Sequence, residues 1–258
     1  MNKQMKSDGT VGKALQVLDL VAELGRPVRF SELLELSEFP KASLYRFLQT
    51  LTNQGMLAYD PVGQTYTPGL RLVRLAHAAW RSTSLAPIAR PFIDKLAQET
   101  GETVHLAQMD GGQVLYVDKR NAAAPVEMFS SAGKIGPGYC TGVGKAIMAH
   151  LPLADQDRAI SQQAFLRYTD STLTTARALR ADLEDVRAAG VAFDREEHEP
   201  GIICIAAPIM SGNRAIGGLS VTSTTQRHSL QTLENFKPLV LAASQDISAA
   251  AANWQFPS

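Results

Sequence analysis

The chain has 258 residues with 25 Lys and Arg against 25 Asp and Glu, so its formal net charge is zero. This length predicts one large or two moderate domains, and the balanced charge excludes a polybasic protein that binds nucleic acid with its whole surface. The sequence has no run near the ~18 apolar residues of a membrane helix, no apolar signal core, and only two cysteines, Cys140 and Cys204. We therefore expect a cytoplasmic protein without a membrane partner or a disulfide framework.

The zero net charge is the sum of two opposite segments. Residues 1–81 carry ten Lys and Arg against seven Asp and Glu, a net charge of +3, whereas residues 82–258 carry 15 against 18, a net charge of −3. The basic excess is concentrated in residues 39–81, which hold five Lys and Arg and one Asp. A partner meets one face of a protein at a time, so this segment is a candidate for nucleic-acid binding. Chance scatter of surface charge is the alternative.

Residues 7–68 predict three helices and then a hairpin. Apolar residues recur at helical spacing in residues 11–24, and Ser31 is the expected N-cap of a short second helix. A third helix over residues 41–53 has an apolar stripe at i, i+3, i+4 and i+7. Residues 56–67 contain two short strand patterns joined by the turn sequence DPVG. This order of elements is typical of a winged helix-turn-helix.

The free face of the helix at 41–53 carries the side chains that suit a DNA groove. Arg46 has the fork that pairs with guanine, and Gln49 has the amide that pairs with adenine. Hydroxyl and Lys side chains near the helix start suit phosphates, which fix the register of a protein on DNA. With the wing turn included, we predict DNA contacts at Ser31, Lys41, Ala42, Ser43, Tyr45, Arg46, Gln49, Thr50, Gly63 and Gln64. For the helix taken alone, a solvated amphipathic helix is the alternative.

A mixed α and β pattern begins after a predicted linker helix at residues 69–84, which either packs against a partner copy or simply connects two domains. In chain order, we then expect a helix at 86–100, strands at 103–110, 113–120 and 126–130, helices at 141–151 and 176–189, strands at 191–194, 202–210 and 215–222, and a C-terminal helix at 229–252 kinked by Pro238. The sequence thus predicts a first domain at residues 7–68, the linker helix, and a second domain at residues 85–255.

The segment YCTGVGK allows three interpretations. A phosphate-binding P-loop needs Gly and Ser or Thr at two positions where this chain has Tyr and Ala. A nucleophilic Cys140, with His105 or His198 as its base, has no supporting motif spacing. The third interpretation is a helix start capped by Thr141, where glycines let backbone amides approach an anionic ligand and Lys145 faces either solvent or a carboxylate. Glycines that serve packing alone are the alternative to this third interpretation.

The segment at residues 190–222 combines an acidic cluster with two apolar strands. Alternation places Cys204 on one face of the first strand, and Ser220 and Thr222 on one face of the second. If both faces line one cavity with Asp194, that cavity holds a carboxylate, a thiol and hydroxyls among apolar walls, which suits a small polar organic ligand. Zinc held by an Asp, a His and Cys204 is the alternative, although the spacing matches no metal motif. We predict neither a metal nor a cofactor.

Together these segments resemble the IclR family of bacterial transcriptional regulators over essentially the whole chain. The resemblance rests on FPKASLYRFLQTLTNQGML, on GYCTGVGKAIMA, and on FDREEHEPGIICIAAPI followed by GGLSVTS. It implies an α+β protein in which an N-terminal winged helix-turn-helix is joined by a linker helix to a C-terminal GAF-like, mixed α/β effector-binding domain. It also implies that homodimers or dimers of dimers bind palindromic double-stranded DNA operators, and that a small organic acid changes their affinity for the operator. The resemblance favours a repressor over an activator, because repression is the more common activity in this family.

The resemblance also implies a set of effector contacts. Tyr139 stands where many members have His, and Thr222 stands where some have Ser, which changes the size and polarity of the pocket and leaves the effector's identity open. By position, the implied contacts are Met128, Tyr139, Cys140, Gly142, Val143, Asp194, Ile202, Cys204, Ser220 and Thr222. We expect no catalytic residue. An enzyme using Cys140, and a winged helix that binds only protein, are the alternatives.

Overall fold

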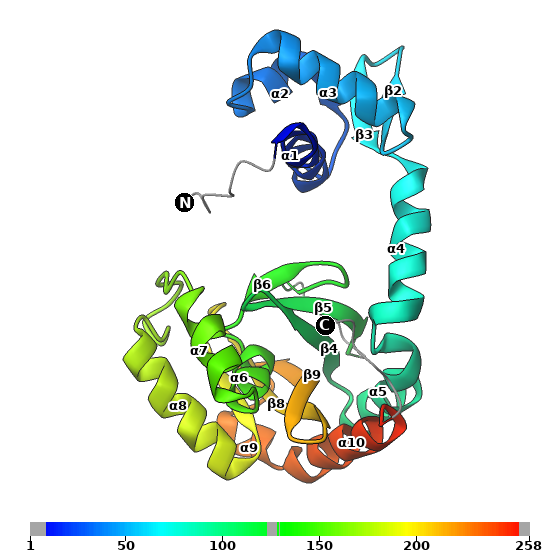
Figure 1. Ribbon diagram of the computed structural model, residues 1–258. Helices are drawn as coiled ribbons and strands as arrows, with labels where there is room; N and C mark the ends of the chain where they lie inside the picture. Colours follow the sequence, from blue (N-terminus) through cyan, green and yellow to red (C-terminus); the bar gives the residue numbers. More distant parts are fainter. Residues whose placement is uncertain (1–8, 123–127, 129, 253–258) are drawn as a thin grey trace. The chain divides into compact units, whose positions relative to one another are not determined.

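The computed structural model describes residues 9–122, 128 and 130–252, and the chain divides between Ser82 and Thr83 into a first and a second compact unit (Figure 1). The first unit is mainly helical with a small sheet, and the second contains a larger sheet covered by helices. Within the described residues, no helix is long and apolar enough to cross a membrane.

The first unit contains the three helices and the hairpin that the sequence predicts. Its three strands form an antiparallel sheet in the order β1-β3-β2. The elements are α1 (Gly9–Glu23), β1 (Val28–Arg29), α2 (Phe30–Leu36), α3 (Lys41–Asn53), β2 (Leu57–Asp60), β3 (Thr65–Pro68) and α4 (Leu70–Thr83), which runs to the boundary. Strand β1 is absent from the sequence prediction, because two residues are too short to show a period.

The core of the first unit forms where the apolar stripe of α3 packs against α1. The predicted stripe is confirmed, because all four of its residues are buried: Leu44, Phe47, Leu48 and Leu51. The same cluster contains apolar residues of α1, α2 and the sheet, among them Val17, Val21, Leu33, Leu57 and Tyr66. Since one side of α3 is used for packing, its opposite, polar side is left at the surface.

The start of α2 differs from the prediction. Strand β1 pairs with β3 as far as Arg29, which has an extended backbone with φ −85° and ψ 157°. The chain therefore enters the helix directly from the strand, and Arg29 occupies the N-cap position. Ser31 lies inside the first turn of α2, so the prediction that Ser31 caps this helix is wrong.

The turn between β2 and β3 is closed by one carboxylate, as its Asp-Pro-Val-Gly sequence predicts. Asp60 accepts hydrogen bonds from the backbone amides of Val62 and Gly63, each at 3.0 Å. Gln64 follows with a φ of 53°, a left-handed conformation that is uncommon outside glycine. The hairpin is confirmed, and this wing presents Gly63 and Gln64 next to each other at its tip.

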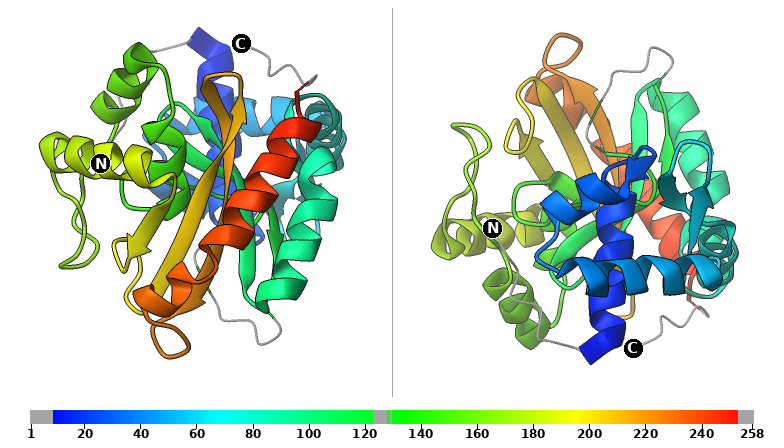
Figure 2. Two further views of the ribbon diagram at one scale, coloured as in Figure 1. Left: turned by 90° about the horizontal axis from the view of Figure 1, so that it is seen from below. Right: turned by 90° about the horizontal axis from the view of Figure 1, so that it is seen from above.

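The second unit is built on six antiparallel strands in the order β6-β5-β4-β9-β8-β7. Helix α6 packs on one face of this sheet, with α7 and α8 against it, while α5 and α10 lie side by side on the other face (Figure 2). The elements are α5 (Ala86–Thr100), β4 (Thr103–Asp110), β5 (Gln113–Arg120), β6 (Ile135–Pro137), α6 (Gly142–Ala149), α7 (Leu153–Ser161), α8 (Ala176–Ala189), β7 (Ala192–Arg195), β8 (Ile202–Ser211), β9 (Arg214–Thr224), α9 (Leu230–Glu234) and α10 (Lys237–Ala250).

The C-terminal segment corrects one prediction. Two helices, α9 and α10, replace the single helix expected at residues 229–252, and Pro238 lies in the first turn of α10. Backbone amides in the first turn have no acceptor within the helix, so a proline there costs no hydrogen bond. Pro238 therefore lies at the start of a separate helix and does not kink a longer one. Ser229 caps α9 by accepting a hydrogen bond from the Thr232 amide.

Other differences concern short elements. The sequence predicts neither the edge strand β6 nor the polar helix α7, and the helix expected at residues 141–151 ends at Ala149. Most of the strand expected at residues 126–130 lies outside the described residues. Met128 and Ser130, which are described, are not part of a strand.

Candidate functional site

The first candidate site is the polar side of α3, and the structure places most of the predicted DNA contacts there. Ser43 is half-buried, while the other predicted residues of the helix are exposed: Lys41, Ala42, Tyr45, Arg46, Gln49 and Thr50. The rings of Tyr45 and Phe30 form a T-shaped pair with their centroids 6.2 Å apart, which connects the start of α3 to α2. A surface helix with Arg and Gln on one free side has the groups that read base edges in a major groove.

A hollow of about 780 Å³ lies beside this helix, between the first turns of α2 and α3 and the wing. It brings together five of the predicted DNA contacts: Ser31, Lys41, Ala42, Tyr45 and Gln64. It also contains residues that the sequence reasoning missed, namely Arg29, Phe30, Tyr59 and Tyr66. Arg29 adds a cation to that of Lys41, so the hollow has the charge and hydroxyl groups that phosphates bind.

The second candidate site is a small cavity of about 30 Å³ between α6 and the sheet of the second unit, here called the inner chamber. Eight of the predicted effector contacts line it: Met128, Gly142, Val143, Asp194, Ile202, Cys204, Ser220 and Thr222. The other lining residues are His105, Tyr116, Ser130, Thr141, His198 and Glu199. Of these, the sequence predicts Thr141 at the helix start that approaches an anionic ligand, names the two histidines only as possible partners of a cysteine or of zinc, and does not predict the other three as contacts. Two predicted contacts lie elsewhere, because Tyr139 lines a neighbouring cavity and Cys140 is buried in the core.

Strand register explains why these distant residues meet. Across the sheet, Asp194 pairs with Cys204 and Cys204 with Thr222, while Ser220 pairs with His105. Directly paired residues of antiparallel strands project to the same face, and so do residues two apart on one strand. The four neighbouring strands β7, β8, β9 and β4 therefore direct these side chains to one face of the sheet, as the alternation in the sequence predicts.

A chain of hydrogen bonds runs along the floor of the inner chamber. The Ser130 hydroxyl lies 2.7 Å from Nε2 of His105, whose Nδ1 lies 3.1 Å from the Thr222 hydroxyl. Burial lowers the pKa of His105 to about 3, with the charge of Lys119 as a smaller cause, so the imidazole is neutral. A neutral imidazole donates at one nitrogen and accepts at the other, and it offers a ligand no positive charge.

The start of α6 lies so close to strand β8 and to the preceding loop that two of its residues have no room for a side chain. A Cβ on Gly142 would lie 2.5 Å from Sγ of Cys204, and a Cβ on Gly144 would lie 2.3 Å from the Gly138 oxygen. Thr141 is the N-cap residue, but its hydroxyl donates to the Pro137 carbonyl at 2.8 Å. The prediction that the Thr141 side chain caps the helix is wrong, because that hydroxyl closes the preceding turn.

Both cysteines are buried and free. Burial, reinforced by the Asp194 carboxylate, raises the pKa of Cys140 and of Cys204 above the usual range. A nucleophilic cysteine needs the opposite change, toward the thiolate. Among the described residues, no group of three or more His, Cys, Asp or Glu is arranged to hold a metal ion.

The sequence allows Lys145 to face either solvent or a carboxylate, and in the structure it contacts two carboxylates. Its ammonium is fully buried and lies 2.5 Å from Oε1 of Glu197 and 3.0 Å from Oδ2 of Asp182. The Glu197 amide in turn donates to Oδ1 of Asp194 at 2.8 Å. Lys145 thus anchors the loop that follows β7 and, through Glu197, holds Asp194 at the inner chamber.

The Asp194 carboxyl at the inner chamber has a pKa well above the usual range of aspartate. Burial raises the pKa of its carboxyl to about 7, and the negative charge of Glu197 raises it further. Near neutral pH the carboxyl therefore exists in both forms. The protonated form donates a hydrogen bond, and the ionised form only accepts.

Replacing Asp194 with Asn should change how stability depends on pH. In wild type the folded chain retains the Asp194 proton up to its pKa of about 7, whereas the unfolded chain loses it near 3.8. Wild type should therefore lose stability relative to Asp194→Asn as pH rises through this window, by at most ~1.4 kcal/mol per pH unit. Urea denaturation between pH 5 and pH 8 measures the difference. Asp170→Asn, which changes an exposed carboxylate, serves as the control. If the difference in unfolding free energy between wild type and Asp194→Asn did not change with pH, the raised pKa of Asp194 would be wrong.

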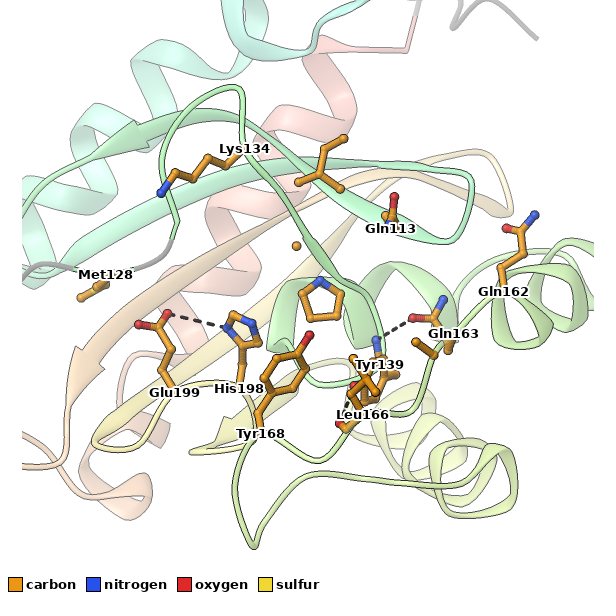
Figure 3. Close-up of a pocket in the computed structure, with 14 residues that line it drawn as sticks. Gln113, Met128, Lys134, Tyr139, Gln162, Gln163, Leu166, Tyr168, His198 and Glu199 are labelled. Atoms are coloured by element: carbon orange, nitrogen blue, oxygen red, sulfur yellow. Dashed lines mark hydrogen bonds and ion pairs between the residues drawn. The ribbon is translucent and has the colours of Figure 1, made fainter. Parts of the chain in front are cut away.

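A larger cavity of about 720 Å³, here called the outer chamber, lies next to the inner chamber (Figure 3). The two chambers share Met128, His198 and Glu199. The outer chamber is further lined by Gln113, Lys134, Ile135, Gly136, Pro137, Tyr139, Gln162, Gln163, Ala164, Leu166 and Tyr168. The sequence predicts only Tyr139 and Met128 of this set as effector contacts. His198 and Glu199 belong to the segment FDREEHEPG, and the other residues come from segments without a recognisable motif.

Comparisons with known proteins agree for both units. The family model described as IclR helix-turn-helix domain matches residues 10–61, and the one described as bacterial transcriptional regulator IclR C-terminal matches residues 77–249. The HTH-type transcriptional regulator BhcR of Paracoccus denitrificans is 32% identical over 92% of this chain and 85% of its own length. The HTH-type transcriptional regulator KdgR of Escherichia coli is 29% identical over 98% of this chain and 97% of its own length.

Solved structures support the same assignment. The IclR of Thermotoga maritima is 27% identical with a TM-score of 0.75, over 94% of this chain and 98% of that protein. An IclR homologue of Microbacterium hydrocarbonoxydans in complex with 4-hydroxybenzoate has the same fold, with a TM-score of 0.79 at 21% identity over 94% of this chain and 98% of that one. With the winged helix-turn-helix and the antiparallel sheet domain, these matches exclude the enzyme alternative: the chain belongs to the IclR family of DNA-binding bacterial transcriptional regulators.

Proposed function

We propose that this protein is a repressor whose affinity for a palindromic operator changes when a small organic acid binds at the inner chamber. The observation that carries the proposal is the enclosed polar cavity, with Asp194 and the Ser220 and Thr222 hydroxyls, in a chain that also has a winged helix. The transcriptional repressor IclR of Escherichia coli, 26% identical over 92% of this chain and 88% of its own length, supports repression over activation.

The start of α6 supports an acid as the ligand. Gly142 and Val143 line the inner chamber at the first turn of this helix, where the helix dipole and backbone amides favour a negative group. The 4-hydroxybenzoate held by the Microbacterium homologue is an organic acid of this kind.

We place the DNA-binding domain at residues 7–68, the linker helix at 69–84 and the effector domain at 85–255, in a cytoplasmic protein. The division of the chain between Ser82 and Thr83, near the end of α4, supports this arrangement.

A second copy of the chain would complete the DNA-binding form. Helix α4 exposes apolar side chains along its length: Leu70 is 86%, Val73 66% and Leu75 45% accessible to solvent. A neighbouring copy would cover such residues. Two winged helices related by a two-fold axis match a palindromic operator. Two such dimers could associate further into a dimer of dimers.

The coupling between ligand and DNA requires a difference in affinity between two states of the protein. A ligand that bound both states equally would leave operator affinity unchanged. In allosteric proteins such coupling is typically about 1–3 kcal/mol. The effector must therefore prefer one arrangement of the DNA-binding domains.

Replacing Asp194 with Ala separates the two activities in this proposal. A thermal-shift screen of the wild type against small organic acids and sugar acids first identifies a binding acid. Fluorescence anisotropy then measures DNA affinity with and without that acid. We expect Asp194→Ala to bind DNA as wild type does and to lose the response, because Asp194 lies in the second unit at the chamber wall. An unchanged ligand titration would rule out this chamber as the effector site, and the absence of DNA binding by wild type would refute the proposed function.

A further inference from the structure

We infer that a small acid binds at the inner chamber together with one proton, which Asp194 takes up from solvent as the acid enters. The inference rests on the proposed function and adds a second input to it, because operator affinity then responds to pH as well as to the acid. Three features of the inner chamber carry it: a small volume, a described lining without Lys or Arg, and a buried carboxyl at Asp194.

The inner chamber is too small to keep two negative charges apart. Its volume of about 30 Å³ holds two or three water-sized groups, since one water needs roughly 10–15 Å³ in this measure. An acid group in this space lies close to the Asp194 carboxyl, which lines the same chamber. At an effective dielectric constant of about 20, two like charges about 5 Å apart change a proton affinity on the order of a hundredfold. Two ionised carboxyls are therefore strongly disfavoured here.

The cations near the inner chamber are already balanced by carboxylates. None of the described residues that line it is Lys or Arg, and the buried imidazole of His105 is neutral. The Lys145 ammonium lies 2.5 Å from the carboxylate of Glu197 and 3.0 Å from that of Asp182. Arg195 lies 3.3 Å from Asp182 and 3.9 Å from Glu197. Two cations and two carboxylates thus offset each other, and a second negative charge in the chamber has no counter-ion among them.

Titratable groups surround Asp194 from several elements. Burial, with the charges of Glu197 and Glu199 as smaller causes, raises the pKa of the Asp194 carboxyl to about 7 against the opposing charge of Lys145. The other titratable and charged groups are Cys140 before α6, Asp182 on α8, Arg195 on β7, His198 after β7, Cys204 on β8, His105 on β4 and Tyr116 on β5. Burial raises the pKa of the two thiols and of the Tyr116 hydroxyl, so these groups stay neutral.

The sign of the coupling follows from these charges. An anion beside Asp194 favours the neutral carboxyl, so binding raises the pKa of Asp194 above its value of about 7 in the free protein. Well below pH 7 the free protein already holds this proton, and the acid binds without uptake. Above pH 7 the proton must come from solvent, and affinity falls by up to about tenfold per pH unit. The protonated Asp194 then donates a hydrogen bond to the acid, as in pairs of carboxyls that share one proton.

Isothermal titration of the full-length chain with acetate counts the protons, because a carboxyl group makes up most of this probe. Binding heats are measured at one pH in two buffers of different ionisation enthalpy, and their difference gives the number of protons taken up. We expect about 0.8 proton per acetate at pH 8 and about 0.1 at pH 6, if binding raises the proton affinity about a hundredfold. Acetate should bind roughly tenfold more weakly at pH 8 than at pH 6.

Asp194→Asn separates the proton from the hydrogen bond, because asparagine has a similar size and donates at every pH without titrating. This variant should bind acetate within about twofold at pH 6 and pH 8 and take up no proton. Asp170→Asn, at an exposed carboxylate, is the control and should keep the pH dependence of the wild type. The proton count of the wild type decides the inference even if Asp194→Asn does not fold.

Three results would overturn the proton uptake: no saturable acetate binding, no proton taken up by the wild type at pH 8, or an Asp194→Asn protein that keeps the pH dependence. The last result would assign the proton to another group, such as His198. All three leave the proposed function intact if the thermal-shift screen finds an acid that changes DNA affinity. Failure of the wild type to bind DNA would instead refute the proposed function itself.

Discussion

Lys145→Met is expected to destabilise the second unit by about 3–5 kcal/mol, the usual cost of breaking a buried ion pair by removing one partner. The Lys145 ammonium is fully buried against Glu197 and Asp182, and methionine fills a similar volume without a charge. Glu197 would keep a buried carboxylate whose cation is gone. Equilibrium unfolding in urea, followed by circular dichroism, measures the loss.

The matched control is Arg180→Met. Arg180 pairs with Asp157 at 2.6 Å, but both side chains are about half exposed, and such pairs contribute about 0–1 kcal/mol. If Lys145→Met cost no more than Arg180→Met, the buried cluster would not anchor the loop after β7. A double variant, Lys145→Met with Glu197→Leu, should recover part of the stability because no buried carboxylate is left facing the lost cation at position 197.

Arg46→Ala is expected to weaken specific DNA binding by about 1–3 kcal/mol, which is roughly 5- to 150-fold in affinity. The side chain lies on the exposed side of α3, while the buried stripe of the same helix stays intact, so the fold should not change. Fluorescence anisotropy on a DNA sequence selected by the wild type measures the change.

Arg167→Ala is the control for this substitution, because Arg167 is an exposed arginine of the second unit. It should leave DNA affinity within about twofold, since Arg167 is not part of the winged helix and a single exposed charge is largely screened at physiological salt. An Arg46→Ala protein that binds like wild type would show that another part of the first unit reads the DNA.

Local sequence patterns predicted the elements with regular periods. The stripe of α3, the strands at 103–110 and 113–120 and the helix at 176–189 agree with the structure residue by residue, because each repeats its period several times. Elements without enough repeats, such as the two-residue strand β1, escaped prediction. The start of α2 was also misplaced at Ser31, because its true position depends on the pairing of Arg29 with β3, which is distant in sequence.

The candidate effector site was predicted where its residues belong to motifs or alternate along strands. Asp194, Cys204 and Thr222 are brought together by the register of three strands, and alternation on each strand already indicated their faces. The outer chamber was not predicted, because Gln113, Leu166 and Tyr168 come from separate segments whose approach depends on the tertiary fold. The contact of His198 with both chambers was not predicted either, because the position of its loop depends on the buried pair of Lys145 and Glu197.

In the proposed function, α3 and the wing recognise a specific DNA sequence. Selection of bound sequences by the purified full-length chain from a random double-stranded DNA library tests it most directly. We predict enrichment of an inverted repeat by the wild type, and loss or relaxation of one base position in each half-site with Arg46→Ala. If the wild type enriched no sequence, or if Arg46→Ala enriched the same sequence at equal affinity, α3 would not be the element that recognises DNA bases.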